Sequence, residues 1–171
     1  MKLIENVFLT DAVICRKINN LRGNRALDLL FKYSTRMGDG WLYLLFLPVL
    51  YIISSSTFML LISPMIKGFA VNLTIYKFIK ISVKRQRPCV QFEDVISLVK
   101  PPDKYSFPSG HISIAVMFSV IVGSLYPVFI LFFILYSLLV AFSRVYNGVH
   151  YPLDIFAGSI LGVIIGYIMI S

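Results

Sequence analysis

Cysteine, histidine and acidic side chains are all scarce in this chain of 171 residues. Its 2 cysteines, Cys15 and Cys89, match neither a zinc-binding spacing nor a disulfide framework, so we expect both to be ordinary residues. Charged residues make up only 14% of the chain, hydrophobic residues make up 58%, and the mean hydropathy is +0.82. This composition excludes an ordinary soluble domain and indicates a polytopic membrane protein with room for one compact bundle.

The acidic residues are too few to balance the basic ones. There are 8 Asp and Glu against 16 Lys and Arg, which gives a net charge of +8. In a membrane protein such an excess is typical of contact with anionic lipid headgroups or of a topology signal. A nucleic-acid partner is not expected, because the sequence has no separate soluble basic domain.

Long hydrophobic runs are missing from residues 1–40, where short apolar stretches alternate with charges. A signal peptide is not expected there, because Glu5, Asp11 and Arg16 interrupt any apolar core and no small-residue cleavage site follows. The pattern predicts amphipathic helices lying at the membrane interface. A simple cap on a helical bundle is the alternative. Gly38-Asp39-Gly40 then predicts a turn.

Five apolar segments occupy the rest of the chain. The first, 41–63, is uncharged and long enough to span a bilayer, with Pro48 as a possible kink and Pro64 as the turnaround. Gly158, Gly162 and Gly166 form a small-residue ladder in the last segment, which favours close packing within the bundle over a dimer interface. The oligomeric state is left open. The remaining expected spans are 65–83, 109–125, 128–143 and 152–170.

Together these segments predict an all-α fold, a polytopic membrane helical bundle of about five transmembrane helices. Residues 1–171 then form a single domain. Within it, residues 1–40 are the interfacial amphipathic segment and residues 41–171 are the transmembrane bundle.

The most informative polar residues fall in three short blocks. They are Lys80-x6-Arg87-Pro88, Pro108-Ser109-Gly110-His111 and Ser143-Arg144-x5-His150-x3-Asp154. The first block lies at the exit of the second span, and the second block lies at the start of the third span. Since the third and fourth spans form a hairpin that turns at Tyr126-Pro127, the chain returns to the same face at the third block. We therefore expect all three blocks to meet at one membrane surface.

The three blocks supply three fixed cations, Lys80, Arg87 and Arg144. Arginine grips phosphate oxygens with two donors, and lysine acts as a compact point charge. Taken singly, Lys80 and Arg87 are more typical of interfacial cations that keep their heads in water. Lys84 and Arg85 are expected to be such solvated charges.

The second block predicts the start of a helix. Ser109 is a good N-cap, Gly110 lets the backbone approach a ligand closely, and first-turn amides attract anions. Taken alone, an ordinary cap before a membrane helix explains Pro-Ser-Gly equally well.

The only 2 histidines, His111 and His150, both fall in the blocks. Asp154 can accept a hydrogen bond from His150 and fix its tautomer, which leaves the other ring nitrogen free as a nucleophile. A zinc site built from His111, His150 and Asp154 is a competing hypothesis. The three nearby cations disfavour it, because they repel a metal ion and attract an anion.

Taken together, the blocks resemble the tripartite signature of the type 2 phosphatidic acid phosphatase family. These integral-membrane lipid phosphatases are related to soluble bacterial acid phosphatases and to vanadium haloperoxidases. Every fixed position of the signature is present at the right internal spacing between residues 80 and 154. One departure concerns layout, because many bacterial members carry a further spanning helix near the N-terminus, where this chain looks interfacial.

The resemblance implies a metal-independent hydrolase without a cofactor that acts on a membrane lipid phosphate or diphosphate. It implies that His150 attacks phosphorus, Asp154 orients His150, and His111 protonates the leaving oxygen. It further implies that the phosphoryl oxygens are held by Lys80, Arg87, Arg144 and the amides near Ser109 and Gly110. The implied substrates are lipid A 1-phosphate, a polyprenyl diphosphate, phosphatidylglycerophosphate or phosphatidic acid.

Other functions remain as alternatives. A non-catalytic membrane protein that binds an anionic lipid would need the cations and not the histidines. A transporter or channel is disfavoured, because no expected span carries a deeply buried charge. Similar bacterial enzymes imply an inner-membrane protein whose active site faces the periplasm. The positive-inside rule favours the opposite side, because the predicted layout places only Lys67 on the far face.

Overall fold

The computed structural model describes residues 2–171, with side chains described from residue 5 onward. This part of the chain is helical with connecting loops and no strands, which confirms the predicted all-α fold. In chain order the elements are α1 (Lys2–Asn19), α2 (Arg25–Met37), α3 (Trp41–Ile53), α4 (Ser55–Val83), α5 (Pro88–Gln91), α6 (Gly110–Leu125), the short 3-10 helix η1 (Pro127–Phe129), α7 (Ile130–Tyr146) and α8 (Pro152–Ile170).

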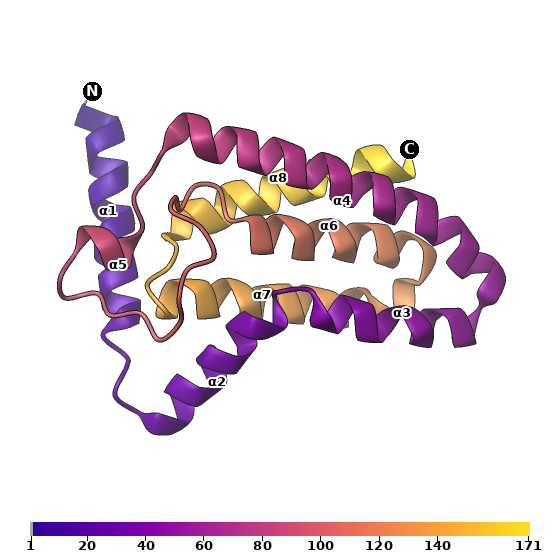
Figure 1. Cartoon of the computed structure of the whole chain (residues 1–171), viewed down its shortest axis with the longest axis horizontal. Helices are drawn as coiled ribbons and strands as arrows, with labels where there is room; N and C mark the ends of the chain where they lie inside the picture. The colour runs from indigo at the N-terminus through magenta and orange to yellow at the C-terminus, as the bar shows by residue number, and fades with distance from the viewer. Residues whose placement is uncertain (1) are drawn as a thin grey trace.

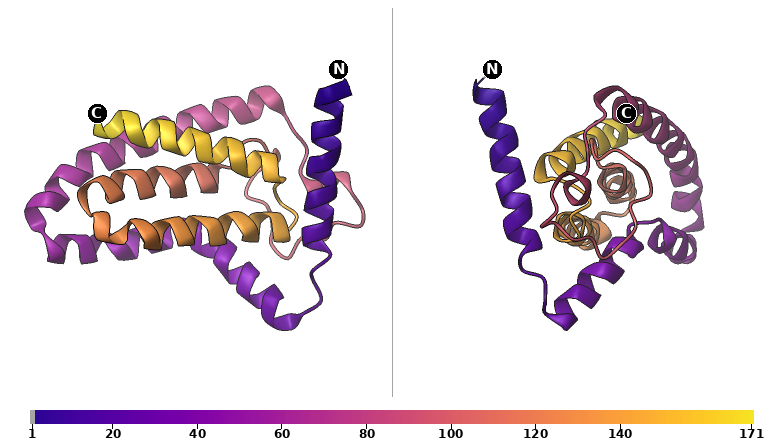
Figure 2. Two further views of the ribbon diagram at one scale, coloured as in Figure 1. Left: turned by 180° about the vertical axis from the view of Figure 1, so that it is seen from behind. Right: turned by 60° about the vertical axis from the view of Figure 1, so that its left-hand side comes forward.

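The long helices run along one axis of the molecule, and the first two do not. Figure 1 shows α4, α6, α7 and α8 side by side along the long axis. In the same view α1 stands across one end of these helices, and α2 is inclined below α7 near that end. The views in Figure 2 agree that α1 crosses the end where α8 begins and where the loop around α5 lies. The α1 helix packs against α7 and α8, and α2 packs against α7.

The first apolar segment ends earlier than expected. Pro64, the predicted turnaround, lies inside α4, and the chain turns at Ser54 instead. Ser54 has extended backbone angles and its hydroxyl accepts a hydrogen bond from the Thr57 amide, so it caps α4. Lys67 consequently lies on the body of α4 rather than in a loop, so it is not the far-face charge assumed above.

Length and composition mark three helical segments as candidate membrane spans: Ser55–Gln91, Pro127–Tyr146 and Pro152–Ile170. The pair α2 and α3 qualifies as a fourth span only when taken together, with a bend of 62° between them. The α6 helix is apolar and shorter, with 16 residues. Leu60, Phe78, Leu131 and Ile164 are among many large hydrophobic side chains that the bundle leaves exposed, which identifies an integral membrane protein.

The closest helix pair in the bundle is α6 and α8. The glycine ladder of α8 lies against α6, as predicted. A Cβ atom at Gly158 would collide with the Ser109 carbonyl, and one at Gly162 would collide with the Ser113 carbonyl. Small residues allow such close backbone approach in membrane helices. The ladder thereby fixes the start of α6 beside the start of α8.

Candidate active site

All eight predicted site residues lie at the end of the bundle that α1 crosses. Lys80 is in the last turn of α4, Arg144 is in the last turn of α7, and Asp154 is in the first turn of α8. The expectation that the three blocks meet at one face is met by the geometry. The elements that carry the others are the start of α5 for Arg87, the start of α6 for Ser109, Gly110 and His111, and the loop between α7 and α8 for His150.

A cavity of about 700 Å³ opens at this end and extends between α3 and α4. Five of the predicted residues line it, namely Lys80, Arg87, Gly110, His111 and His150. Ser109, Arg144 and Asp154 are not among the residues that line it. The remaining walls are mostly apolar and include Leu44, Leu47, Ile62, Met65, Ile66, Phe69, Met117 and Phe118. The cavity is therefore polar and charged at one end, where Asp39 and Asp103 also line it, and apolar along its sides.

Lys80 and Arg87 both bind the carboxylate of Asp103. The Lys80 Nζ lies 2.8 Å from Asp103 Oδ2, and the Arg87 Nη2 lies 2.6 Å from Asp103 Oδ1. Burial raises the pKa of Asp103, but hydrogen bonds from Lys80 and Arg87 outweigh it and hold that pKa below its ordinary value. An anionic group therefore already occupies these cations. No local pattern points to Asp103, which lies in a polar loop among other charges.

Arg144 is buried with donors to spare. Its Nη1 donates to the Thr35 hydroxyl of α2 at 3.0 Å, while its Nε and Nη2 have no partner in the structure. Its guanidinium is only 3% exposed. Buried charged donors without a partner are costly, so this arrangement is typical of a site that receives an anion.

The second block begins α6 as predicted, with Ser109 at the N-cap position. The Ser109 hydroxyl makes no capping bond and is a buried oxygen without a partner, while the Ser109 amide donates to the Asp154 carbonyl at 3.0 Å. A Cβ at Gly110 would lie 2.9 Å from the ring of Tyr76. The absent side chain therefore makes room for Tyr76.

His111 is paired with a carboxylate that sequence reasoning missed. Its Nε2 lies 2.7 Å from Oδ1 of Asp39, which belongs to the turn between α2 and α3. Hydrogen bonding to His111 lowers the pKa of Asp39 below its ordinary value. Gly38-Asp39-Gly40 was predicted only as a turn, because nothing in its spacing relates it to His111.

His150 is 1% exposed, and its Nε2 lies 3.3 Å from Nη1 of Arg87. A guanidinium has no acceptor, so in this contact Nε2 is the acceptor and the ring proton lies on Nδ1. Burial, with further contributions from Arg144, Arg87 and Lys80, holds the pKa of His150 well below its ordinary value of 6.5. The imidazole is therefore neutral at neutral pH, with an unprotonated Nε2 facing the cations.

The predicted hydrogen bond between His150 and Asp154 is not formed. The Nδ1 of His150 lies 3.5 Å from Asp154 Oδ2 and has no hydrogen-bond partner. Asp154 Oδ2 instead accepts from the Tyr151 amide at 2.9 Å, which also caps the first turn of α8. The carboxylate faces the imidazole without a close bond to it.

Arg85 was predicted to be a solvated charge, and this prediction is wrong. Its side chain is only 13% exposed, and its Nη1 donates to Asp154 Oδ1 at 2.7 Å. Its Nη2 donates to Asp11 Oδ2 of α1 at 2.5 Å. The sequence could not separate Arg85 from Lys84, because both belong to one run of cations.

Within residues 2–171 the structure brings no three His, Cys, Asp or Glu side chains together in a metal-binding group. His111 is hydrogen-bonded to Asp39, whereas His150 faces Asp154 at 3.5 Å without a hydrogen bond. At the cavity the described residues bring together two imidazoles and the cations Lys80 and Arg87, which Asp103 binds.

Comparisons with known proteins give one consistent result. The sequence model of the PAP2 superfamily matches residues 49–171. An undecaprenyl-diphosphatase of Sulfolobus acidocaldarius is 33% identical over 106 residues, which are 61% of this chain and 51% of that protein. The chain thus matches about half the length of this curated relative.

Two solved structures share the fold over nearly the whole chain. The crystal structure of LpxE from Aquifex aeolicus superposes with a TM-score of 0.74 at 30% identity, covering 92% of each chain. The crystal structure of a transmembrane PAP2 type phosphatidylglycerolphosphate phosphatase from Bacillus subtilis superposes with a TM-score of 0.74 at 26% identity, covering 96% of this chain and 84% of that one.

Proposed function

The chain belongs to the PAP2 superfamily, and from this we propose that it hydrolyses the phosphate or diphosphate group of a membrane lipid. One observation carries the proposal. The cavity holds two histidines, two cations and their carboxylate partners at one end, and it is walled by apolar side chains along its length. That combination suits an amphiphile with an anionic head and a hydrocarbon tail.

The reaction we propose has two steps with a covalent intermediate. In the first, the Nε2 lone pair of His150 attacks phosphorus, the bond from phosphorus to the leaving oxygen breaks, and His111 gives that oxygen a proton. In the second, His111 takes a proton from water as the water oxygen attacks phosphorus, and the bond from phosphorus to Nε2 breaks. The products are the dephosphorylated lipid and inorganic phosphate.

The phosphoryl group must be held by cations that are occupied at rest. Lys80 and Arg87 would release Asp103 and take phosphoryl oxygens instead, and the unpartnered Nε and Nη2 of Arg144 would supply further donors. The amides at Ser109 and Gly110 begin α6, where an anion is favoured by the helix dipole. No cofactor or metal ion is part of this proposal.

The substrate class follows from the relatives and from the apolar walls. The matched curated relative is an undecaprenyl-diphosphatase, and one matched structure is a phosphatidylglycerolphosphate phosphatase. We propose that the substrate is one of four lipids. Two are of the types named for these relatives, a polyprenyl diphosphate and phosphatidylglycerophosphate, and the other two are phosphatidic acid and lipid A 1-phosphate. All four carry a phosphoryl group on an apolar tail. The rates of phosphate release from a panel of all four would identify the preferred substrate.

The test is phosphate release by the detergent-purified chain in EDTA, with the four lipids as substrates and His150→Ala as the control. We expect release by the wild type and none above background by the variant. Release that continues in His150→Ala would overturn the proposed mechanism. Lipid binding that needs Lys80 and Arg87, without release by the wild type, would support the non-catalytic lipid-binding alternative.

We also propose that the protein lies in a bacterial inner membrane with its active site facing the periplasm. Lys100 lies in the loop between α5 and α6, at the active-site end. A Lys100→Cys variant, with Cys15 and Cys89 replaced by serine, should react with a membrane-impermeant maleimide in cells whose inner membrane is intact. Labelling only after that membrane is permeabilised would contradict the proposed orientation.

A further inference from the structure

A buried ion-pair network joins the N-terminal helix α1 to the carboxylate of Asp154. We propose that Arg85, held by Asp11 of α1, is a positioning residue that fixes the carboxylate of Asp154 against His150. The inference rests on the proposed function only in its kinetic consequence. Its structural consequence can be measured on a protein with no activity.

The guanidinium of Arg85 bridges two buried carboxylates. Its Nη1 donates to Asp154 Oδ1 at 2.7 Å, and its Nη2 donates to Asp11 Oδ2 at 2.5 Å. The side chains of Asp11 and Asp154 are 2% and 0% exposed. The Arg85 Cζ also lies 3.8 Å from the centre of the Tyr151 ring. Two carboxylates buried this deeply need a shared cation, and the planar guanidinium supplies one donor to each.

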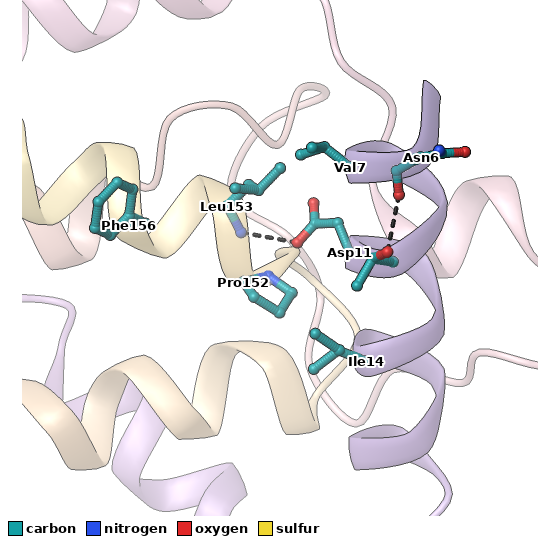
Figure 3. A pocket seen from close by; sticks show the side chains of 8 residues that line it. Asn6, Val7, Asp11, Ile14, Pro152, Leu153 and Phe156 are labelled. Atoms are coloured by element: carbon teal, nitrogen blue, oxygen red, sulfur yellow. Dashed lines mark hydrogen bonds between the residues drawn. The ribbon is translucent and has the colours of Figure 1, made fainter. Parts of the chain in front are cut away.

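Asp11 holds more than Arg85. Its second oxygen, Oδ1, accepts a hydrogen bond of 2.9 Å from the amide of Leu153, in the first turn of α8. Figure 3 shows this bond crossing from α1 to α8 beside a cavity of about 380 Å³. Asp11 therefore binds both the guanidinium and the backbone of the helix turn that carries Asp154. The α1 helix, for which an interfacial helix and a cap on the bundle were the two predictions, is joined through this residue to the first turn of α8.

The bridge constrains the orientation of the Asp154 carboxylate. Arg85 takes Oδ1, and the Tyr151 amide takes Oδ2, which also faces Nδ1 of His150 at 3.5 Å. With both oxygens held, the carboxylate plane cannot rotate freely, and Oδ2 stays directed toward the protonated ring nitrogen. Arg85 does not line the main cavity, so its influence on the reaction passes through Asp154.

A matched control exists on the same helix. Arg16 and Asp94 also join α1 to the segment after α5, with Nε and Oδ2 2.7 Å apart, but their side chains are 48% and 46% exposed. Exposed ion pairs contribute little, whereas a buried pair that loses one partner leaves an uncompensated charge. Removing Arg16 therefore reproduces the loss of a cation near α1 without disturbing Asp154.

The first test is kinetic. For a lipid that the wild type cleaves, Arg85→Gln should lower kcat by about a hundredfold with KM within about twofold, since misplacement of a reacting group by about 1 Å has that effect. Arg85→Lys, which keeps the charge and loses the fork, should recover part of the loss. Asp11→Asn should lower kcat by roughly tenfold, and Arg16→Gln by less than about twofold.

A double-mutant cycle separates positioning from a general loss of structure. If Arg85 acts through Asp154, adding Arg85→Gln to Asp154→Asn should change kcat by less than about twofold. Independent, multiplying losses in the double variant would overturn the proposal. So would an unchanged kcat in Arg85→Gln, or an equal loss in Arg16→Gln.

The second test needs no activity. Because the chain has only 2 histidines, a His111→Gln background leaves His150 as the only imidazole in a ¹⁵N-histidine spectrum. In that background Arg85→Gln and Asp11→Asn should both move the Nδ1 resonance of His150, and Arg16→Gln should leave it in place. An unmoved resonance would overturn the positioning role. A wild type that releases no phosphate while this resonance moves would refute the proposed function alone.

Discussion

The two histidines of this site form carboxylate pairs of opposite character. His111 and Asp39 are 2.7 Å apart, and the Asp39 side chain, on a surface turn, is 49% exposed. His150 and Asp154 are 3.5 Å apart, and their side chains are 1% and 0% exposed. The residues of the first pair are 72 positions apart in the sequence, and those of the second pair stand at positions i and i+4.

The difference concerns what each imidazole is free to do. The carboxylate beside His111 has no other side-chain partner among the described residues and meets solvent, so this pair can exchange protons with water. The carboxylate beside His150 is already bound by Arg85 and by the Tyr151 amide. The buried imidazole itself is kept neutral by burial and by the nearby cations. The partly exposed pair of His111 and Asp39, here called the open pair, suits the proposed acid and base. The buried pair of His150 and Asp154, here called the closed pair, suits the proposed nucleophile.

The largest effect should come from removing the closed pair's imidazole. His150→Ala should lower kcat more than about a thousandfold, because the covalent step is lost, whereas His111→Ala should lower it by about a hundredfold. Single-turnover phosphate release measures both. Equal losses in the two variants would erase the proposed distinction between nucleophile and acid.

Removing the charge of the closed pair comes next. Asp154→Asn should lower kcat by about a hundredfold, since His150 remains but is held less well. Steady-state kinetics on the same lipid provide the measurement. Asp94→Asn, which changes an exposed carboxylate in the loop after α5, is the control and should retain near-wild-type kcat. A loss as complete as that of His150→Ala would argue against a supporting role.

Removing the charge of the open pair should cost less. Asp39→Asn should lower kcat by roughly tenfold, because water can replace an exposed partner and the proton transfer still operates. The result is read from kcat at neutral pH. A larger loss than in Asp154→Asn would reverse the ranking of the two pairs.

Removing the charge of Asp103, which binds Lys80 and Arg87, should have a smaller effect, and that effect should favour substrate binding. Asp103→Asn should lower KM by about threefold, because phosphate no longer competes with a charged group for Lys80 and Arg87. Inhibition by orthovanadate should tighten in parallel. A raised KM would mean that Asp103 helps to hold the substrate.

The smallest measurement sharpens the comparison through pH. The folded pKa of His150 is depressed below 6.5, so its neutral, nucleophilic form is present above that pKa and is lost only as pH falls through it. In a His111→Gln background, the ¹⁵N shifts of His150 should therefore stay those of a neutral ring at pH 6.5. Half-protonation at pH 6.5 or above would contradict the desolvated site.

Much of this fold was visible in the sequence. The helix Pro152–Ile170 has the predicted bounds, and Gly110–Leu125 begins one residue after the predicted start. Those segments are bounded by proline and by a serine cap, which are strong local signals. The turn at Ser54 was not predicted. Pro64 does not break α4, because a membrane helix tolerates proline, and the Ser54 side chain caps the start of this helix instead.

The site was predictable only in part, for a physical reason. Lys80 and His150 stand at fixed spacings in two different blocks, and the hairpin of the third and fourth spans brings those blocks to one face. Asp39 and Arg85 act through partners 72 and 69 positions away, and no local pattern records such contacts. Arg85 illustrates the point, since burial alone distinguishes it from the exposed Lys84 beside it.

The glycine ladder on α8 has a consequence for how mutations in this protein would be interpreted. Gly158 contacts the carbonyl of Ser109. This one backbone contact therefore sets the gap between the start of α6, which carries the second block, and the start of α8, which carries Asp154 of the third block. A methyl group at Gly158 would widen that gap at its narrowest point. In an activity screen, Gly158→Ala would therefore score among the catalytic lesions, although the glycine touches no reacting atom and carries no chemistry of its own.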